Sequence, residues 1–119
     1  MKDVEYLKQN GIDVNSGLEL LGDMEMYDET LEDFLNECET RLPNLQKYKD
    51  SSDMANYAIQ AHSMKSDSKY LGFMALAEMS LEHEMKSKNN DINYINNNYD
   101  NLITEAKRII NVVKNYLGK

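Results

Sequence analysis

INYINNNYDNLITEAKRIINVVKNY, residues 92–116, is the segment on which the fold class of this chain depends. Its composition favours a loop, because seven of the thirteen residues from Asn89 to Asn101 are asparagine, a poor helix former. Its apolar residues nevertheless recur at every third or fourth position, at Ile92, Ile95, Tyr99, Leu102, Ala106, Ile109, Val113 and Tyr116. Sustained periodicity outweighs single-residue propensity, so the segment is predicted to form one long final helix.

Three earlier segments show the same helical spacing. The first covers residues 27–45 with Pro43 inside it as an expected bend, the second covers 54–71, and the third covers 73–88. The apolar face of the third is predicted to consist of Phe73, Leu76, Ala77, Leu81 and Met85.

Turn residues separate and cap these segments. KDSSD (49–53) offers Ser51, Ser52 or Asp53 as the N-cap of the second helix. Nearer the N-terminus, Ser16 followed by Glu19 has the pattern of a capping box that opens a short helix. The sequence therefore predicts an all-α, up-down four-helix bundle with a short extra N-terminal helix, and residues 1–119 as a single domain.

Composition narrows the classes of partner. The net charge is −8, with 21 acidic against 13 basic residues and no long run of Lys or Arg, which argues against binding to nucleic acid or to an anionic membrane. No apolar run is long enough to span a membrane, and the lone Cys38, in the apolar stripe of its helix, is expected to be a core thiol. We expect a soluble, cytoplasmic protein whose polar outer faces suit a monomer.

His62 is the first candidate for chemistry. It lies off the centre of its apolar stripe, and Lys65 is its i+3 neighbour. Its neighbours one turn away, Ala58 and Ser66, are small and leave the ring accessible, while Ile59 places an apolar side chain on the same flank. A single surface histidine is usually only solvated, but beside Ile59 the accessible ring suggests a docking patch.

Glu84 strengthens this interpretation. It falls on the packing face of residues 73–88, where a carboxylate is costly unless it is hydrogen-bonded or paired. In an antiparallel hairpin it could accept the Nδ1–H bond of His62, fix the tautomer and leave Nε2 as the nucleophile. The alternative is that Glu84 reaches solvent or pairs with a lysine. His83 falls toward the polar side of the same helix and is expected to be solvated.

These residues resemble the histidine-containing phosphotransfer (HPt) domain family. HSMKSDSKYLG fits its pattern of H-x-x-K-[GS] followed by a glycine ten residues after the histidine, here His62, Lys65, Ser66 and Gly72. GLELLGDMEMYDETLEDFLNE is similar to the family's lead-in to its first bundle helix, and the similarity extends from about residue 11 to the end. Met64 stands where leucine is usual, and Asp67 adds negative charge that weakens the local attraction for phosphate.

The resemblance implies a phosphorelay carrier. His62 would take a phosphoryl group from, and pass it to, aspartates of response-regulator receiver domains, with a hybrid histidine kinase as a possible second partner. Lys65 would face the phosphoryl oxygens, Glu84 would orient His62, and Gly72 would have a structural role. Ala58, Ile59, Ser66 and Lys69 are the docking candidates. No cofactor of its own is expected, because Mg²⁺ would come from the receiver, and no nucleotide motif such as GxxxxGK[ST] is present, so the domain is not expected to be an enzyme.

Other classes fit the residues less well. A di-iron bundle needs Glu three residues before each histidine, and Ile59 and Ser80 stand there instead, so no metal site is expected. A nucleophile elbow for hydrolysis has no sheet to carry it. The serious alternative is a helical adaptor that binds a signalling partner without accepting phosphate.

Overall fold

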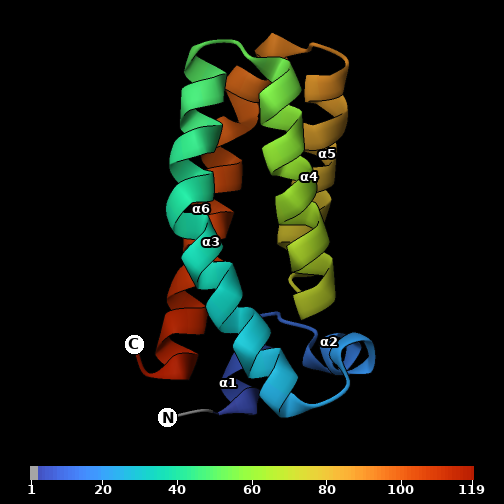
Figure 1. The fold of residues 1–119 in the computed structure, drawn as a ribbon, viewed down its shortest axis with the longest axis vertical. Helices are drawn as coiled ribbons and strands as arrows, with labels where there is room; N and C mark the ends of the chain where they lie inside the picture. Colours follow the sequence, from blue (N-terminus) through green and yellow to red (C-terminus); the bar gives the residue numbers. More distant parts are fainter. Residues whose placement is uncertain (1–2) are drawn as a thin grey trace.

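A computed structural model describes residues 3–119, which form six α-helices and no strand. The helices are α1 (Val4–Gln9), α2 (Val14–Leu21), α3 (Met24–Asp50), α4 (Met54–Leu71), α5 (Met74–Lys88) and α6 (Ile92–Leu117). The four long helices run alternately up and down, and α1 and α2 lie across the end of the bundle at which α3 begins (Figure 1). The predicted all-α bundle is confirmed.

The prediction of one short extra helix was incomplete, because two precede the bundle. The six-residue α1 escapes periodicity analysis, and it is held by Leu7, which is fully buried, and by Asp3, whose side chain accepts the amide of Glu5. Ser16 was also wrongly predicted as the cap of α2. Asp13 is the cap, and it accepts the amide of Ser16 at 3.1 Å.

Aspartate caps recur through the fold. Asp23, Asp53 and Asp91 each accept the amide of the residue three positions later, at the starts of α3, α4 and α6. KDSSD therefore caps α4 through Asp53. Between Met24 and Asp50, α3 continues through Pro43 without interruption.

The asparagine-rich segment is helical, as its periodicity predicted. α6 is one helix from Ile92 to Leu117. It buries Ile95, Leu102, Ala106, Ile109, Val112, Val113 and Tyr116. Its asparagines stay outside this face, where they cost propensity but no burial.

Gly72 ends α4 in a left-handed conformation, with φ of +85°. Its carbonyl accepts the amide of Asp13 at 2.9 Å, which ties α2 to the end of α4. A Cβ at this position would collide with the backbone of Asp13, so both the conformation and the close approach require glycine.

The apolar face predicted for α5 was partly wrong, since Leu81 and Met85 are exposed. The buried face consists of Leu76, Ala77, Ser80, His83, Glu84 and Ser87. α4 and α5 make the most extensive helix–helix contact of the bundle. Small residues are buried on both helices, including Ala58 and Ala61 of α4, whereas Leu81 and Met85 of α5 are turned outward.

Two further expectations concern burial and hydropathy. Cys38 is buried as expected, and burial raises the pKa of its thiol to about 12. Among the described residues, no helix is both long and apolar enough to cross a membrane.

Candidate functional site

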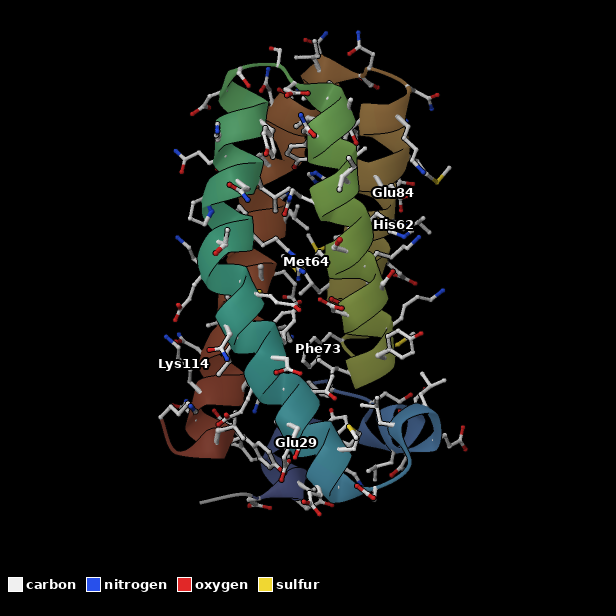
Figure 2. All side chains as sticks on the ribbon, viewed as in Figure 1. Glu29, His62, Met64, Phe73, Glu84 and Lys114 are labelled. Carbon is white, nitrogen blue, oxygen red and sulfur yellow. The ribbon has the colours of Figure 1, made fainter. Side chains whose placement is uncertain are left out.

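His62 projects from α4 on the side turned away from α3 (Figure 2). Its side chain is 55% exposed, whereas Met64, two residues later, is fully buried and points into the bundle. The helix thus presents one ring nitrogen to solvent while its other face packs the core.

Glu84 reaches His62 from α5, as predicted. Its Oε2 lies 2.8 Å from Nδ1 of His62, and the carboxylate is almost completely buried. Burial alone raises the pKa of Glu84, but hydrogen bonds from Lys88, Lys65 and His62 together lower that pKa to about 2. An ionised carboxylate can only accept a hydrogen bond, so Nδ1 carries the proton and Nε2 keeps its lone pair.

Two lysines share this carboxylate. Lys65 Nζ lies 3.0 Å from Oε1, and Lys88 Nζ lies 2.8 Å from Oε2. Lys65 is also 3.4 Å from Nδ1 of His62. Both ammonium groups therefore contact the carboxylate that holds the imidazole and neutralise its charge.

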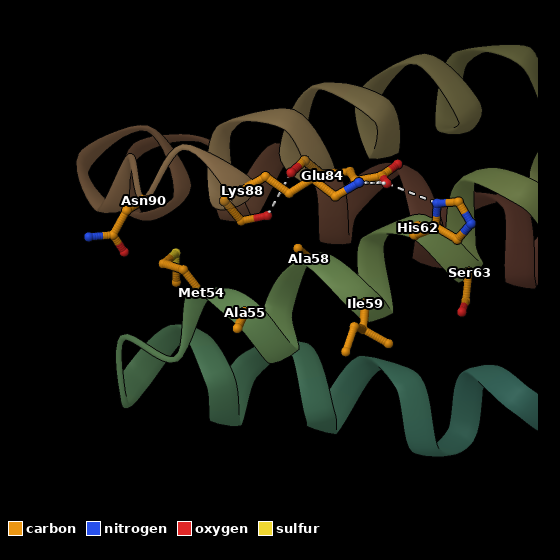
Figure 3. Close-up of a pocket in the computed structure, with 10 residues that line it drawn as sticks. Met54, Ala55, Ala58, Ile59, His62, Ser63, Glu84, Lys88 and Asn90 are labelled. Carbon is orange, nitrogen blue, oxygen red and sulfur yellow. Dashed lines mark hydrogen bonds and ion pairs between the residues drawn. The ribbon is translucent and has the colours of Figure 1, made fainter.

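A groove of about 650 Å³ leads from His62 along α4 and α5 (Figure 3). Met54, Ala55, Ala58 and Ile59 form its apolar side, and Glu84 and Lys88 lie opposite. Ser87 of α5 also lines the groove. Among the predicted docking residues, Ile59 is 60% exposed, whereas Ala58 is buried and contributes only to the lining of the groove. Of the other two, Lys69 is exposed and Ser66 is half-buried.

Three residues near the site were missed in the sequence. Lys88 stands one turn after Glu84, an i,i+4 spacing that could have revealed the ion pair. Leu81 and Met85 lie about 60° and 100° around α5 from Glu84, on the flank that includes Lys88. Both were assigned to the core because they are large and apolar, yet their exposure adds apolar surface beside the site.

The negative charge of Asp67 affects the site less than its sequence position suggested, because Arg41 pairs with it. Its Oδ2 lies 3.0 Å from Nη1 of Arg41, and the Arg41 side chain is only 8% exposed. The same guanidinium binds Glu37, and the hydrogen bond between Glu37 and Asp67 raises the pKa of Glu37. Asp67 is therefore paired on the side of α4 that faces α3.

His83 corrects the prediction of a solvated side chain. It is buried, and its Nδ1 lies 2.8 Å from the hydroxyl of Tyr57. Burial lowers its pKa to about 4, opposed by a hydrogen bond with the backbone of Asn98, so the ring is neutral at pH 7. Within residues 3–119, no group of His, Cys, Asp and Glu side chains has the arrangement of a metal site.

The Hpt domain family model matches residues 29–109, which run from the first turns of α3 into α6 and include His62, Lys65 and Glu84. No curated protein and no solved structure matches the chain.

Proposed function

The chain belongs to the Hpt domain family, whose members carry phosphoryl groups in two-component signalling, and we propose that His62 is its phosphoacceptor. One observation carries the proposal. The exposed ring of His62 is held through Nδ1 by a buried, ionised carboxylate, so that Nε2 faces solvent with an available lone pair. No other histidine of the described residues combines these properties, because His83 is buried.

The proposed donor is an aspartyl-phosphate of a receiver domain. Nε2 attacks phosphorus, the N–P bond forms, and the P–O bond breaks with its electron pair leaving on the aspartate carboxylate. The ring becomes positively charged, and Glu84 stabilises that charge through the Nδ1–H bond. The reverse reaction returns the group to an aspartate. Because the transition state of phosphoryl transfer is loose, positioning and charge neutralisation supply most of the catalysis.

Lys65 and Lys88 supply the positive charge on this side. Both contact Glu84 in the unmodified protein, so neither is committed to the position that a phosphoryl group on Nε2 occupies. We propose that Lys65 turns toward the phosphoryl oxygens once they are present, while Lys88 retains the carboxylate. Mg²⁺ is assigned to the receiver partner.

The receiver is proposed to dock over His62. Ile59 on α4 and Leu81 and Met85 on α5 offer exposed apolar side chains that a partner can cover. Ser66 and Lys69 continue along α4 beyond His62 and give this surface a polar margin. A receiver partner in turn implies a cytoplasmic location, and a hybrid histidine kinase could supply the receiver.

Incubation with a phosphorylated receiver domain and Mg²⁺, followed by intact mass measurement, tests the proposal. We expect an acid-labile gain of one phosphoryl group in the wild type and none in His62→Gln. Phosphoramidate serves as a small donor that needs no docking partner. If neither donor labels His62 in the folded protein, the phosphocarrier proposal is wrong and a non-phosphorylated adaptor function takes its place.

A further inference from the structure

The buried His83 is not used by the proposed reaction, yet it lies next to Glu84 in the chain. Tyr57 is completely buried, and burial raises the pKa of its hydroxyl, which therefore stays protonated and donates. His83 accepts this bond at Nδ1, so its proton is on Nε2. The His83 ring also meets the ring of Tyr94 on α6 edge-on, with centroids 5.5 Å apart.

This contact and the functional site join the same two helices. Tyr57 and His62 are both on α4, and His83 and Glu84 are both on α5, so two cross-helix hydrogen bonds of 2.8 Å connect them. Successive residues of a helix point about 100° apart. The Tyr57–His83 bond and the His62–Glu84 bond therefore hold α5 from two directions, and a rotation of α5 strains both.

We propose that His83 and Tyr57 are positioning residues, whose hydrogen bond sets the rotation of α5 so that the Glu84 carboxylate meets Nδ1 of His62. Neither touches the phosphoryl group. Ser87 supports the same segment, since its hydroxyl donates to the backbone carbonyls of His83 and Glu84 at 2.6 and 3.0 Å. The functional consequence rests on the proposed function, whereas the structural coupling does not.

The chain offers a matched control for this proposal. Tyr57→Phe removes one buried hydroxyl that bonds His83. Tyr116→Phe removes another, which donates to Asp28 at 2.7 Å near the C-terminal end of α6. Both variants lose one hydrogen bond of a buried tyrosine and keep the aromatic ring. The bond to Asp28 is partly buried and ends on a carboxylate, so the control is expected to lose at least as much stability as Tyr57→Phe.

Two measurements are compared at a temperature at which each variant is fully folded. The first is the ¹⁵N NMR spectrum of the imidazoles, in which the His62 signals report its tautomer and the bond to Glu84. The second is the rate of phosphorylation of His62 by phosphoramidate. We expect Tyr57→Phe to shift the His62 signals toward a mixture of tautomers and to slow phosphorylation about fivefold, the effect of losing roughly one neutral hydrogen bond. Tyr116→Phe is expected to leave both unchanged.

Substitutions of His83 provide the second arm. His83→Asn keeps an acceptor oxygen as many bonds from the backbone as Nδ1, whereas His83→Leu has no acceptor. We expect the His62 signals of His83→Asn to stay close to those of the wild type. In His83→Leu we expect them to shift as in Tyr57→Phe. Equal His62 spectra in wild type and Tyr57→Phe, or equal changes in Tyr57→Phe and Tyr116→Phe, would overturn the proposal. Because the spectrum needs no phosphate, it remains decisive even if His62 is not a phosphoacceptor.

Discussion

The two histidines of this protein sit 21 residues apart on neighbouring helices and are held in opposite tautomers. His62 donates a hydrogen bond from Nδ1–H to an ionised carboxylate and turns Nε2 outward. His83 accepts a hydrogen bond at Nδ1 from a phenol and keeps its ring inside the bundle. The same side chain is thus a nucleophile in one place and a structural link in the other, according to the partner at Nδ1 and the exposure of the ring.

The largest effect is expected when one of the two histidines is removed. His62→Gln is expected to abolish labelling by phosphoramidate, while its folding stability changes by less than about 0.5 kcal/mol because the side chain is exposed. His83→Asn is expected to keep the label on His62. Peptide mapping by mass spectrometry under neutral conditions locates the label. Phosphate found on His83 in either variant would contradict the assignment.

Acid is expected to destabilise the fold through His83. The pKa of His83 is lowered from 6.5 to about 4, so between these values the unfolded chain takes up a proton that the folded chain refuses. Stability from this group is complete above pH 6.5 and falls by roughly 3 kcal/mol as the pH drops to 4. The pKa of Glu84 is lowered from 4.5 to about 2. Its contribution to folding stability is therefore lost only below about pH 4.5, as the pH falls toward 2.

Urea denaturation at intervals from pH 7 to pH 5 measures this pH dependence of the free energy of unfolding. Most carboxylates titrate below this range. In the wild type the free energy of unfolding should decrease as the pH falls, and in His83→Leu that dependence should be much weaker. His83→Leu is itself expected to be less stable by about 1–3 kcal/mol at pH 7, because the Tyr57 hydroxyl is left buried without its acceptor. An undiminished pH dependence in His83→Leu would assign the proton uptake to another group.

A smaller effect is expected when the partner of His62 loses its charge. Glu84→Gln retains an oxygen that can accept from Nδ1, but it no longer stabilises a positive ring and leaves Lys65 and Lys88 unpaired. Charge-assisted hydrogen bonds exceed neutral ones by about 1 kcal/mol, so phosphorylation should slow roughly three- to tenfold. Stopped reactions with phosphoramidate give the rate, and Glu82→Gln on the exposed face of α5 is the control. Equal rates in the two variants would show that the charge of Glu84 is irrelevant.

The smallest effect belongs to Lys88. Its ammonium is 63% exposed, so its ion pair with the Glu84 carboxylate is screened by solvent. Lys88→Met should slow phosphorylation less than about threefold and change stability by less than about 0.5 kcal/mol. Lys86→Met removes a neighbouring lysine that lies over the ring of Tyr94 and serves as the matched variant. A loss in Lys88→Met as large as in Glu84→Gln would assign Lys88 a direct part in the reaction.

Helical periodicity predicted most of the fold and, at the site, the contact between His62 and Glu84. It was sufficient for α6, despite the asparagines, because a long apolar stripe must be buried whatever the local propensity. It also placed Glu84 on the packing face of α5, from which the bond to His62 could be anticipated. The six-residue α1 was missed, since a helix so short shows no period. The Asp13 cap of α2 was also missed, because Ser16 was taken as the cap.

The prediction for His83 was wrong because the buried face of α5 was placed by its apolar residues alone. Leu81 and Met85 are more apolar than Ser80 and Ser87, yet the serines are buried and the larger residues are exposed. Close packing against α4 favours small side chains at the contact. This requirement depends on both helices, so the sequence of α5 alone does not show it. A polar residue can therefore face the interior wherever its neighbour supplies a partner, as Tyr57 does for His83.

The first measurement to make is ¹⁵N and ³¹P NMR of the imidazole-labelled protein before and after treatment with phosphoramidate. We predict opposite tautomers for the two histidines at the start, Nδ1–H in His62 and Nε2–H in His83. After treatment we predict a single phosphoryl group on Nε2 of His62 and unchanged signals from His83. A phosphoryl group on Nδ1 of His62, on His83, or on neither ring of the folded protein would contradict this prediction.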